Sequence, residues 1–212
     1  MTAPIVVAPV PNLPVAPTTY GTRYHDQLNM VLRLFFNQLR NNLISLFGIQ
    51  GGRFLNTPYG QFSSTVDQTA AATTAAYAFE YDTSDQTNGV TLASASEIAV
   101  DYEGIYNVQF SAQFVNTDSA EQDADVWFRT DGADVANSNS RISIVKSHGS
   151  GYGHAIMALN YLVHLKPDEP LKIMWCVTNT SVSLQAFPAG TTPTRPAIPS
   201  VIVTVTYVSA AP

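Results

Sequence analysis

The sequence offers few residues whose type and spacing could support catalysis or metal binding. Its four histidines are His25, His148, His154 and His164, and none stands at an HxH or HExxH spacing. Cys176 is the single cysteine, so neither a CxxC site nor an intrachain disulfide can form. The pattern therefore predicts no metal centre and no bound cofactor.

Two further motifs lack essential parts of an active site. The Gly-rich segment SHGSGYGH, from Ser147 to His154, is not followed by the Lys and Ser or Thr of a phosphate-binding loop. No serine lies in a GxSxG sequence, which is typical of a hydrolase nucleophile. We expect a protein that is not an enzyme, and we interpret the Gly-rich segment as a surface loop.

An acidic segment, NTDSAEQDAD, is the best candidate for binding an ion. Asp118, Glu121, Asp123 and Asp125 within it offer the hard oxygen ligands that Ca²⁺ prefers. Their spacing lacks the regular pattern and the glycine of an EF-hand, so a solvated loop is the favoured interpretation. Whether this loop, residues 116 to 125, binds Ca²⁺ stays open.

Three residues within apolar runs are expected to pack in the core. Trp127 and Trp175 both lie inside probable strand sequences, where core packing is favoured over sugar stacking. Cys176 follows Trp175 in the run IMWCV, and a free cysteine in such a run is usually buried.

A helix is predicted from about Tyr24 to Phe47, within a segment 20–60 that also contains a Gly-rich linker. Apolar residues recur there at steps of four and three, which is the seam of an oligomerising helix. The seam consists of Leu28, Leu32, Phe35, Leu39, Asn42 and Leu46. Four neighbours widen it beyond a two-stranded stripe, namely Val31, Phe36, Leu43 and Phe47.

The polar side of this helix argues against a membrane role. It carries mostly Asn and Gln, whereas helices that lie on membranes are rich in Lys and Arg. Asn42 in an apolar slot is a known device for fixing register and strand number, although it can also mark a fraying helix end. The segment therefore predicts a homotrimer held by its helices.

Residues 1–19 should form an extended arm. Five prolines interrupt a sequence of Ala, Val and Ile, and each proline fixes φ and removes a backbone donor. Such a segment cannot build its own core, so its apolar residues need a partner to cover them: Ile5, Val6, Val7, Val10, Leu13 and Val15. We expect this arm to dock the protein onto a larger assembly.

Composition excludes several partners and favours contact with other chains. Charged residues make up only 12% of the sequence, about half the usual share, and the net charge is -6. A negative chain does not suit a phosphate backbone, so we expect no nucleic-acid partner. No basic N-terminal region precedes an apolar stretch, and no apolar run reaches membrane-spanning length.

Residues 61–212 predict a mainly β head, an antiparallel jelly-roll sandwich. Nine short β-rich runs follow one another between turn signals, with no helical pattern between them. They are AYAFEY, SEIAV, GIYNVQFSAQFV, ADVWFRT, SRISIV, HAIMALNYLVHL, LKIMWCVT, VSLQAF and SVIVTVTYV. The last run has almost no charge and would aggregate at an exposed edge, so it should be central or lie between subunits.

Several of these runs resemble the jelly roll of the tumour-necrosis-factor and complement globular-head superfamily. The resemblance rests on GIYNVQFSAQF after DYEG, on DVWFRTDGADVANSNSRI, on LVHLKPDEPLKIMW and on the closing apolar strand. It implies trimeric heads that associate through flat apolar and aromatic faces. The second piece, together with the preceding helix, looks like versions found in structural proteins of tailed bacteriophages.

The expected function is therefore that of a virion structural protein, a homotrimeric decoration or short-fibre protein anchored by its arm and helix. Its partners would be its own copies and another virion protein of the capsid, portal or tail. The alternative is a receptor-binding knob of a tail fibre, contacting a host surface glycan through SHGSGYGH and TDGADVANSN. A secreted trimeric ligand is disfavoured because no signal peptide is found.

Overall fold

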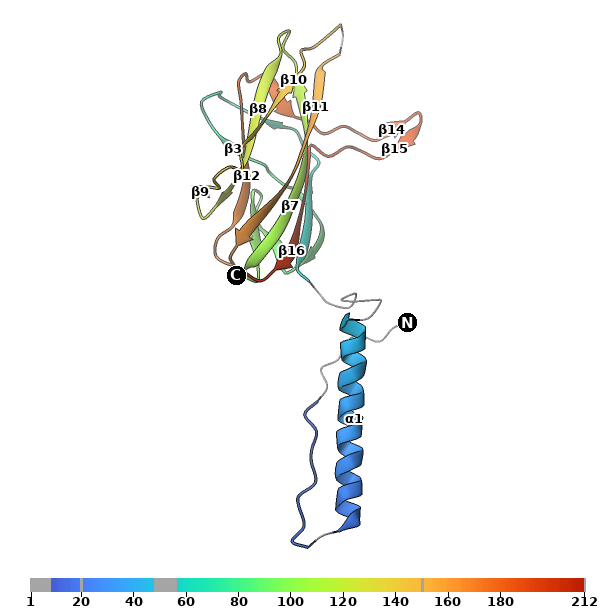
Figure 1. Cartoon of the computed structure of the whole chain (residues 1–212). Helices are drawn as coiled ribbons and strands as arrows, with labels where there is room; N and C mark the ends of the chain where they lie inside the picture. Colours follow the sequence, from blue (N-terminus) through green and yellow to red (C-terminus); the bar gives the residue numbers. More distant parts are fainter. Residues whose placement is uncertain (1–8, 20, 48–56, 150, 212) are drawn as a thin grey trace. The chain divides into compact units, whose positions relative to one another are not determined.

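The computed structural model describes residues 9–19, 21–47, 57–149 and 151–211, and it divides the chain into two compact units between Asn56 and Thr57. The first unit contains helix α1 (Thr22–Phe47), which begins two residues before the predicted start. The second unit contains every described strand and begins inside the predicted linker, with its first strand at Tyr59 (Figure 1). Each unit is described by itself.

Two antiparallel sheets form the head. The β7 sheet has the order β2 (Gln68–Thr69), β13 (Val182–Leu184), β7 (Gly104–Asn116), β16 (Val201–Ser209), β1 (Tyr59–Ser64), β4 (Thr83–Asn88), and β11 (Gly153–Leu165) also pairs with β7. The β8 sheet has the order β10 (Ser140–Ile144), β8 (Gln122–Thr130), β12 (Leu171–Val177), β6 (Glu97–Val100), β5 (Val90–Ser94). Short strands β3 (Tyr77–Ala78) and β9 (Ala133–Asp134) pair with β12 and β8, and β14 (Gly190–Thr191) pairs with β15 (Thr194–Arg195).

The chain crosses repeatedly between the two sheets, from β6 to β7, from β7 to β8 and from β10 to β11. Strands that are distant in sequence therefore become neighbours, as β7 and β16 do in Figure 1. This arrangement confirms the predicted antiparallel jelly-roll sandwich preceded by a helix. The prediction that SVIVTVTYV is central is also confirmed, because β16 pairs with β7 on one side and β1 on the other.

The core lies between the two sheets and is rich in aromatic rings. Alternation along β7 buries Tyr106, Val108, Phe110, Ala112 and Phe114, while the residues between them face outward. Edge-to-face ring contacts then tie the sheets together, with centroids 5.9 Å apart for Phe110–Phe128 and 6.2 Å apart for Phe114–Trp175. The inner face is thus occupied by packing, and function must lie elsewhere.

All nine predicted runs overlap a strand, but three longer strands, β1, β4 and β5, and four two-residue strands, β2, β9, β14 and β15, were not predicted. Strand β4 reads TSDQTN and is largely exposed at a sheet edge, so it has neither apolar alternation nor β-branched enrichment. Strand β4 continues to Asn88, and Gly89 alone, at φ 64°, separates it from β5.

Candidate assembly surfaces

The histidines do not gather into a site. His164 lies at the end of β11, where its Nε2 is 3.0 Å from Glu103 Oε1 in an exposed pair. His154 contacts the Phe187 ring, and His148 forms an isolated bridge with Gly151 in the Gly-rich loop. Among the residues that the structure describes, no three His, Cys, Asp or Glu side chains come together as metal ligands would.

Three of the four candidate carboxylates of the acidic loop have partners within the chain. Asp118 accepts hydrogen bonds from the side chains of Gln122 and Asn179, both at 2.9 Å. Asp123 accepts from Ser143 Oγ at 2.6 Å, and Asp125 accepts two bonds from Arg141 at 2.9 and 2.8 Å. The loop is therefore organised by internal donors, which supports the interpretation of an ordinary surface loop.

The prediction of core packing is correct for Trp175 but wrong for Trp127 and for Cys176. Trp175 is fully buried, whereas Trp127 points to the outer face of the β8 sheet, where its Nε1 donates to Asp134 Oδ1 at 2.8 Å. Cys176 points the same way, only half-buried, with its Sγ 3.9 Å from Asp125. In these strands, residues that face the core alternate with residues that face outward. The alternation is not visible in the sequence, because Trp and Cys are apolar enough to look like core residues on either side.

The outer face of the β8 sheet is a charged surface. Its ion pairs are Arg129–Asp134 at 2.7 Å, Arg141–Asp125 at 2.8 Å and Lys172–Glu97 at 2.8 Å. The bonds from Arg129 and Trp127 lower the pKa of Asp134, so its carboxylate stays ionised at neutral pH. Such a face is well suited to water.

The outer face of the β7 sheet has the opposite character. Register and alternation place 16 side chains of β11, β7 and β16 on it, and none is Asp, Glu, Lys or Arg. They are His154, Ile156, Ala158, Asn160, Leu162, His164, Ile105, Asn107, Gln109, Ser111, Gln113, Val115, Ile202, Thr204, Thr206 and Val208. We call this set the uncharged face.

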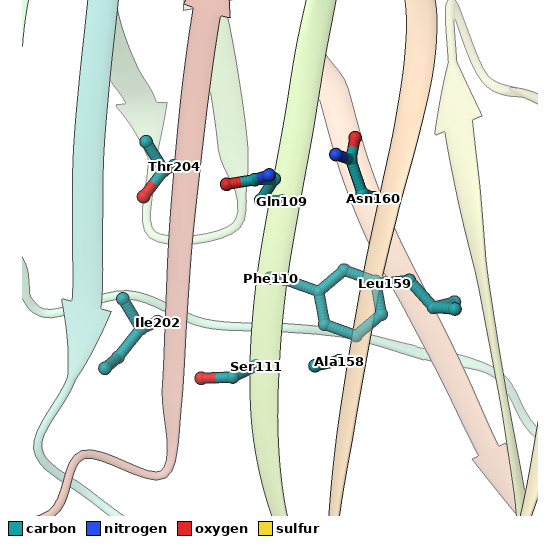
Figure 2. Close-up of a pocket in the computed structure, with 8 residues that line it drawn as sticks. All are labelled: Gln109, Phe110, Ser111, Ala158, Leu159, Asn160, Ile202 and Thr204. Carbon is teal, nitrogen blue, oxygen red and sulfur yellow. The ribbon is translucent and has the colours of Figure 1, made fainter.

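Large aliphatic side chains stand exposed on the uncharged face. Ile156 is 61% exposed and Leu162 is 59% exposed, on either side of Ala158 and Asn160. Between β11 and β16 lies an open hollow of about 410 Å³. Figure 2 shows it lined by a polar row of Thr204, Gln109 and Asn160 and, below it, a row of Ile202, Ser111 and Ala158.

One polar atom on the uncharged face is buried without a partner. Asn107 lies between Leu162 of β11 and Thr206 of β16, and its Oδ1 is inaccessible and accepts no hydrogen bond among the described residues. An unmet acceptor costs free energy, so it must be offset elsewhere or met by another molecule.

The helix seam is only partly covered in a single chain. Leu28, Leu32, Phe35 and Asn42 are half-buried and Leu39 is exposed, while the side chain of Leu46 lies outside the described residues. Of the residues that widen the seam, Phe36 is 58% exposed and Leu43 is also exposed. No helix among the described residues is long and apolar enough to cross a membrane. The seam thus retains apolar surface for a partner.

The described part of the arm is extended and exposed. Residues 9–17 form neither helix nor strand, as their four prolines favour. Val10 and Val15 are 91% and 93% exposed, and Leu13 is half exposed. Ile5, Val6 and Val7 of the predicted docking set lie outside the described residues.

Comparison of the sequence with protein-family models and with curated proteins finds no match.

Sequence reasoning found the seam and the arm but missed the uncharged face. The polar side of GIYNVQFSAQF is visible in the sequence, as Asn107, Gln109, Ser111 and Gln113. This polar side can be recognised as part of the uncharged face only in the folded sheet. There β11 and β16 lie on either side of β7 and add Ile156, Leu162 and Ile202 to the same surface. The absence of charge along the outward positions of all three runs was the available signal.

Proposed function

We propose that the chain is a homotrimeric structural protein of a bacteriophage virion, assembled through the helix seam and the uncharged face and attached to the particle by its N-terminal arm. The observation that carries the assembly is the contrast between the two outer faces of the head. The β8 face holds ion pairs, whereas the outward positions of β11, β7 and β16 hold none of the four charged residue types.

Physical chemistry connects this contrast with self-association. Interface centres are depleted of charged residues, because a charge removed from water without a partner is costly. Covering Ile156 and Leu162 would contribute about 1.5 kcal/mol each before ordering costs. Amides such as Gln109 and Asn160 can donate and accept, so symmetry-related copies can satisfy one another.

A trimer is favoured over a dimer by the width of the apolar helix face. Phe36 and Leu43 lie beside the seam and are exposed in the single chain. Two packed helices would leave them exposed, whereas a bundle of three helices would cover them. The virion assignment is supported by the resemblance to phage structural proteins, by the low charge and by the exposed arm.

Matched substitutions on the two faces test the assembly. Ser111→Arg puts a charge into the hollow of the uncharged face, and Ser143→Arg makes the same change on the β8 face. We expect Ser111→Arg to lower the trimer association constant by at least about tenfold and Ser143→Arg to leave it within about twofold, as measured by sedimentation equilibrium. A wild-type chain that stays monomeric at micromolar concentration would refute the proposed assembly.

Labelling intact particles tests the location. An antibody against the head should decorate virions that carry this chain, and isolated capsids should bind the purified trimer. If neither result is seen, the proposed location on the virion is refuted and the proposed homotrimer is unaffected.

A receptor-binding knob is the second candidate, favoured by the position of Trp127. Its indole lies on the β8 face with Asp134 and Arg129, close to the TDGADVANSN loop, and aromatic rings beside polar groups are typical of sugar sites. A glycan array would distinguish the candidates, since only a knob should bind a defined glycan and lose it on Trp127→Ala.

A further inference from the structure

One hairpin stands out from the body of the head. Strands β14 and β15 form an isolated two-stranded ladder that protrudes from the sandwich in Figure 1. Every residue from Thr191 to Ile198 is exposed. A two-stranded hairpin is marginal in water by itself, so one held away from its own core calls for an explanation.

The hairpin is built to be stiff. At its base, Phe187 and Ile198 exchange two backbone hydrogen bonds of 2.9 Å. Four prolines lie within residues 188–199 and restrict the backbone. Five residues separate the base from the tip, which gives a reach of about 16 Å. A stiff projection loses little entropy when it docks.

Next to the hairpin base lies a groove of about 480 Å³, which we call the root groove. It is lined by Thr65, Val66, Asp67, Ala186, Phe187, Pro188, Ala197, Ile198 and Pro199. Most of these side chains are apolar, and Val66 is exposed. A hollow formed by Gln113, His154 and Ile156 shares Phe187 and Ile198 with it. The root groove is therefore continuous with the uncharged face.

We infer that the β14–β15 hairpin of each subunit docks into the root groove of the neighbouring copy, so that the trimer closes by a cyclic exchange of hairpins. This inference rests on the proposed homotrimer. A heterologous contact of this kind closes into a ring when the rotation between copies is 120°. The occupant is a second copy because the hairpin and the groove carry opposite charges.

The charge complementarity involves Arg195 on the hairpin and two acids at the groove. Arg195 lies across Gly190 and forms no ion pair or hydrogen bond with any described residue. Asp67 is exposed in the groove wall, where it accepts a bond from Ala186 N, and Asp82 accepts bonds from Thr65 of the groove lining. Among the described residues of its own chain, Arg195 has no acidic partner and Asp67 has no basic one. The two side chains could therefore form an ion pair between two copies.

Gly190 allows this placement of Arg195. A Cβ at position 190 would lie 2.7 Å from three side-chain atoms of Arg195, which is too close for a relaxed contact. The glycine therefore leaves room for the arginine side chain to lie across the hairpin, where its guanidinium stays exposed and has no acidic partner among the described residues.

Cysteine cross-linking tests the exchange. In a Cys176→Ser background, which removes the native thiol, Arg195→Cys and Asp67→Cys are introduced together and mild oxidant is added. We expect covalent dimers and trimers on a non-reducing gel. A matched control pairs Arg195→Cys with Lys172→Cys on the β8 face and should stay monomeric under the same conditions.

The outcomes separate the inference from the proposed function. Trimers in sedimentation without intermolecular cross-links would overturn the hairpin exchange and leave the trimer intact. Monomers in sedimentation would overturn the proposed assembly and the exchange with it. Covalent trimers formed only by the Arg195→Cys and Asp67→Cys pair would support both.

A double-mutant cycle tests the charge pair without a cross-link. Arg195→Gln and Asp67→Asn each remove one charge, and the asparagine keeps an acceptor for Ala186 N. Each single change should weaken trimer association about two- to fivefold, and the double variant should be no weaker than either one. Additive effects would overturn the pairing of Arg195 with Asp67.

Discussion

Asn116 shows how a single residue organises one end of the head. Its side chain is fully buried at the end of β7, where Nδ2 donates to the carbonyls of Ala120, Ile144 and Val145 at 2.8 to 3.2 Å. Its Oδ1 accepts from the backbone N–H of Asp118 at 2.9 Å. One amide therefore ties the acidic loop to the ends of β7 and β10.

Replacing Asn116 with alanine should destabilise the head by about 2 to 4 kcal/mol, because three buried or half-buried carbonyls and one N–H lose a partner at once. Urea unfolding followed by tryptophan fluorescence measures this, since both tryptophans lie in the head. Asn139→Ala, the same change at an exposed position, should shift the free energy of unfolding by less than about 0.5 kcal/mol. Equal effects of the two would mean that the amide network contributes nothing.

Cys176 should be a slow thiol. Burial raises its pKa, and the negative charge of Asp125 raises it further, so less thiolate is present at a given pH. At pH 8 we expect a disulfide reagent to modify the folded protein at least about tenfold more slowly than the urea-unfolded protein. Asp125→Asn removes the charge and should speed the reaction, whereas a rate equal to that of the unfolded chain would contradict this account.

At the scale of elements, periodicity in the sequence predicted the strands that have one face buried in the core. Strand β7 was found because Tyr106, Val108 and Phe110 alternate with polar residues, and that alternation follows directly from a sheet with one buried face. Strand β4 was missed because an exposed edge strand imposes no such pattern. The uncharged face could not be predicted, since it depends on which strands flank β7.

The helix allows a direct test of the seam. Phe35→Asp puts a charge in the apolar stripe, and Gln38→Asp puts the same charge on the exposed polar side. We expect Phe35→Asp to lower the trimer association constant by more than about tenfold, because an unpaired charge in an apolar contact is costly. Gln38→Asp should have little effect in the same sedimentation experiment. If both variants associate like the wild type, the helix is not an assembly element.

At the scale of the whole molecule, the two units have different proposed roles. The head buries a complete core between its sheets, so we expect it to fold without help from the arm or the helix. The described residues of the first unit contribute nothing to a comparable core, and Phe36, Val10 and Val15 among them are exposed. Attachment should therefore depend on the first unit, and recognition between copies should involve both.

The arm prediction follows from this division. Deleting residues 1–17 should leave the urea unfolding of the head unchanged and abolish binding to particles that lack the endogenous protein, as measured by co-sedimentation. The exposed side chains of Val10, Leu13 and Val15 could contribute about 1.5 kcal/mol each when covered, before ordering costs. Three arms on one trimer would act together, so the loss multiplies through avidity.

A variant with an arm of the same length tests whether docking depends on the apolar side chains or only on the length of the arm. Replacing Ile5, Val6, Val7, Val10, Leu13 and Val15 with serine keeps every proline, so the arm should stay extended while the side chains of the predicted docking set are removed. If covering these side chains is what docks the trimer, the serine variant should bind as poorly as the deletion. If the serine variant binds normally and the deletion does not, the backbone or the other residues of the arm make the contact. Equal occupancy by the deletion and the intact chain would transfer the docking role to the helix or the head.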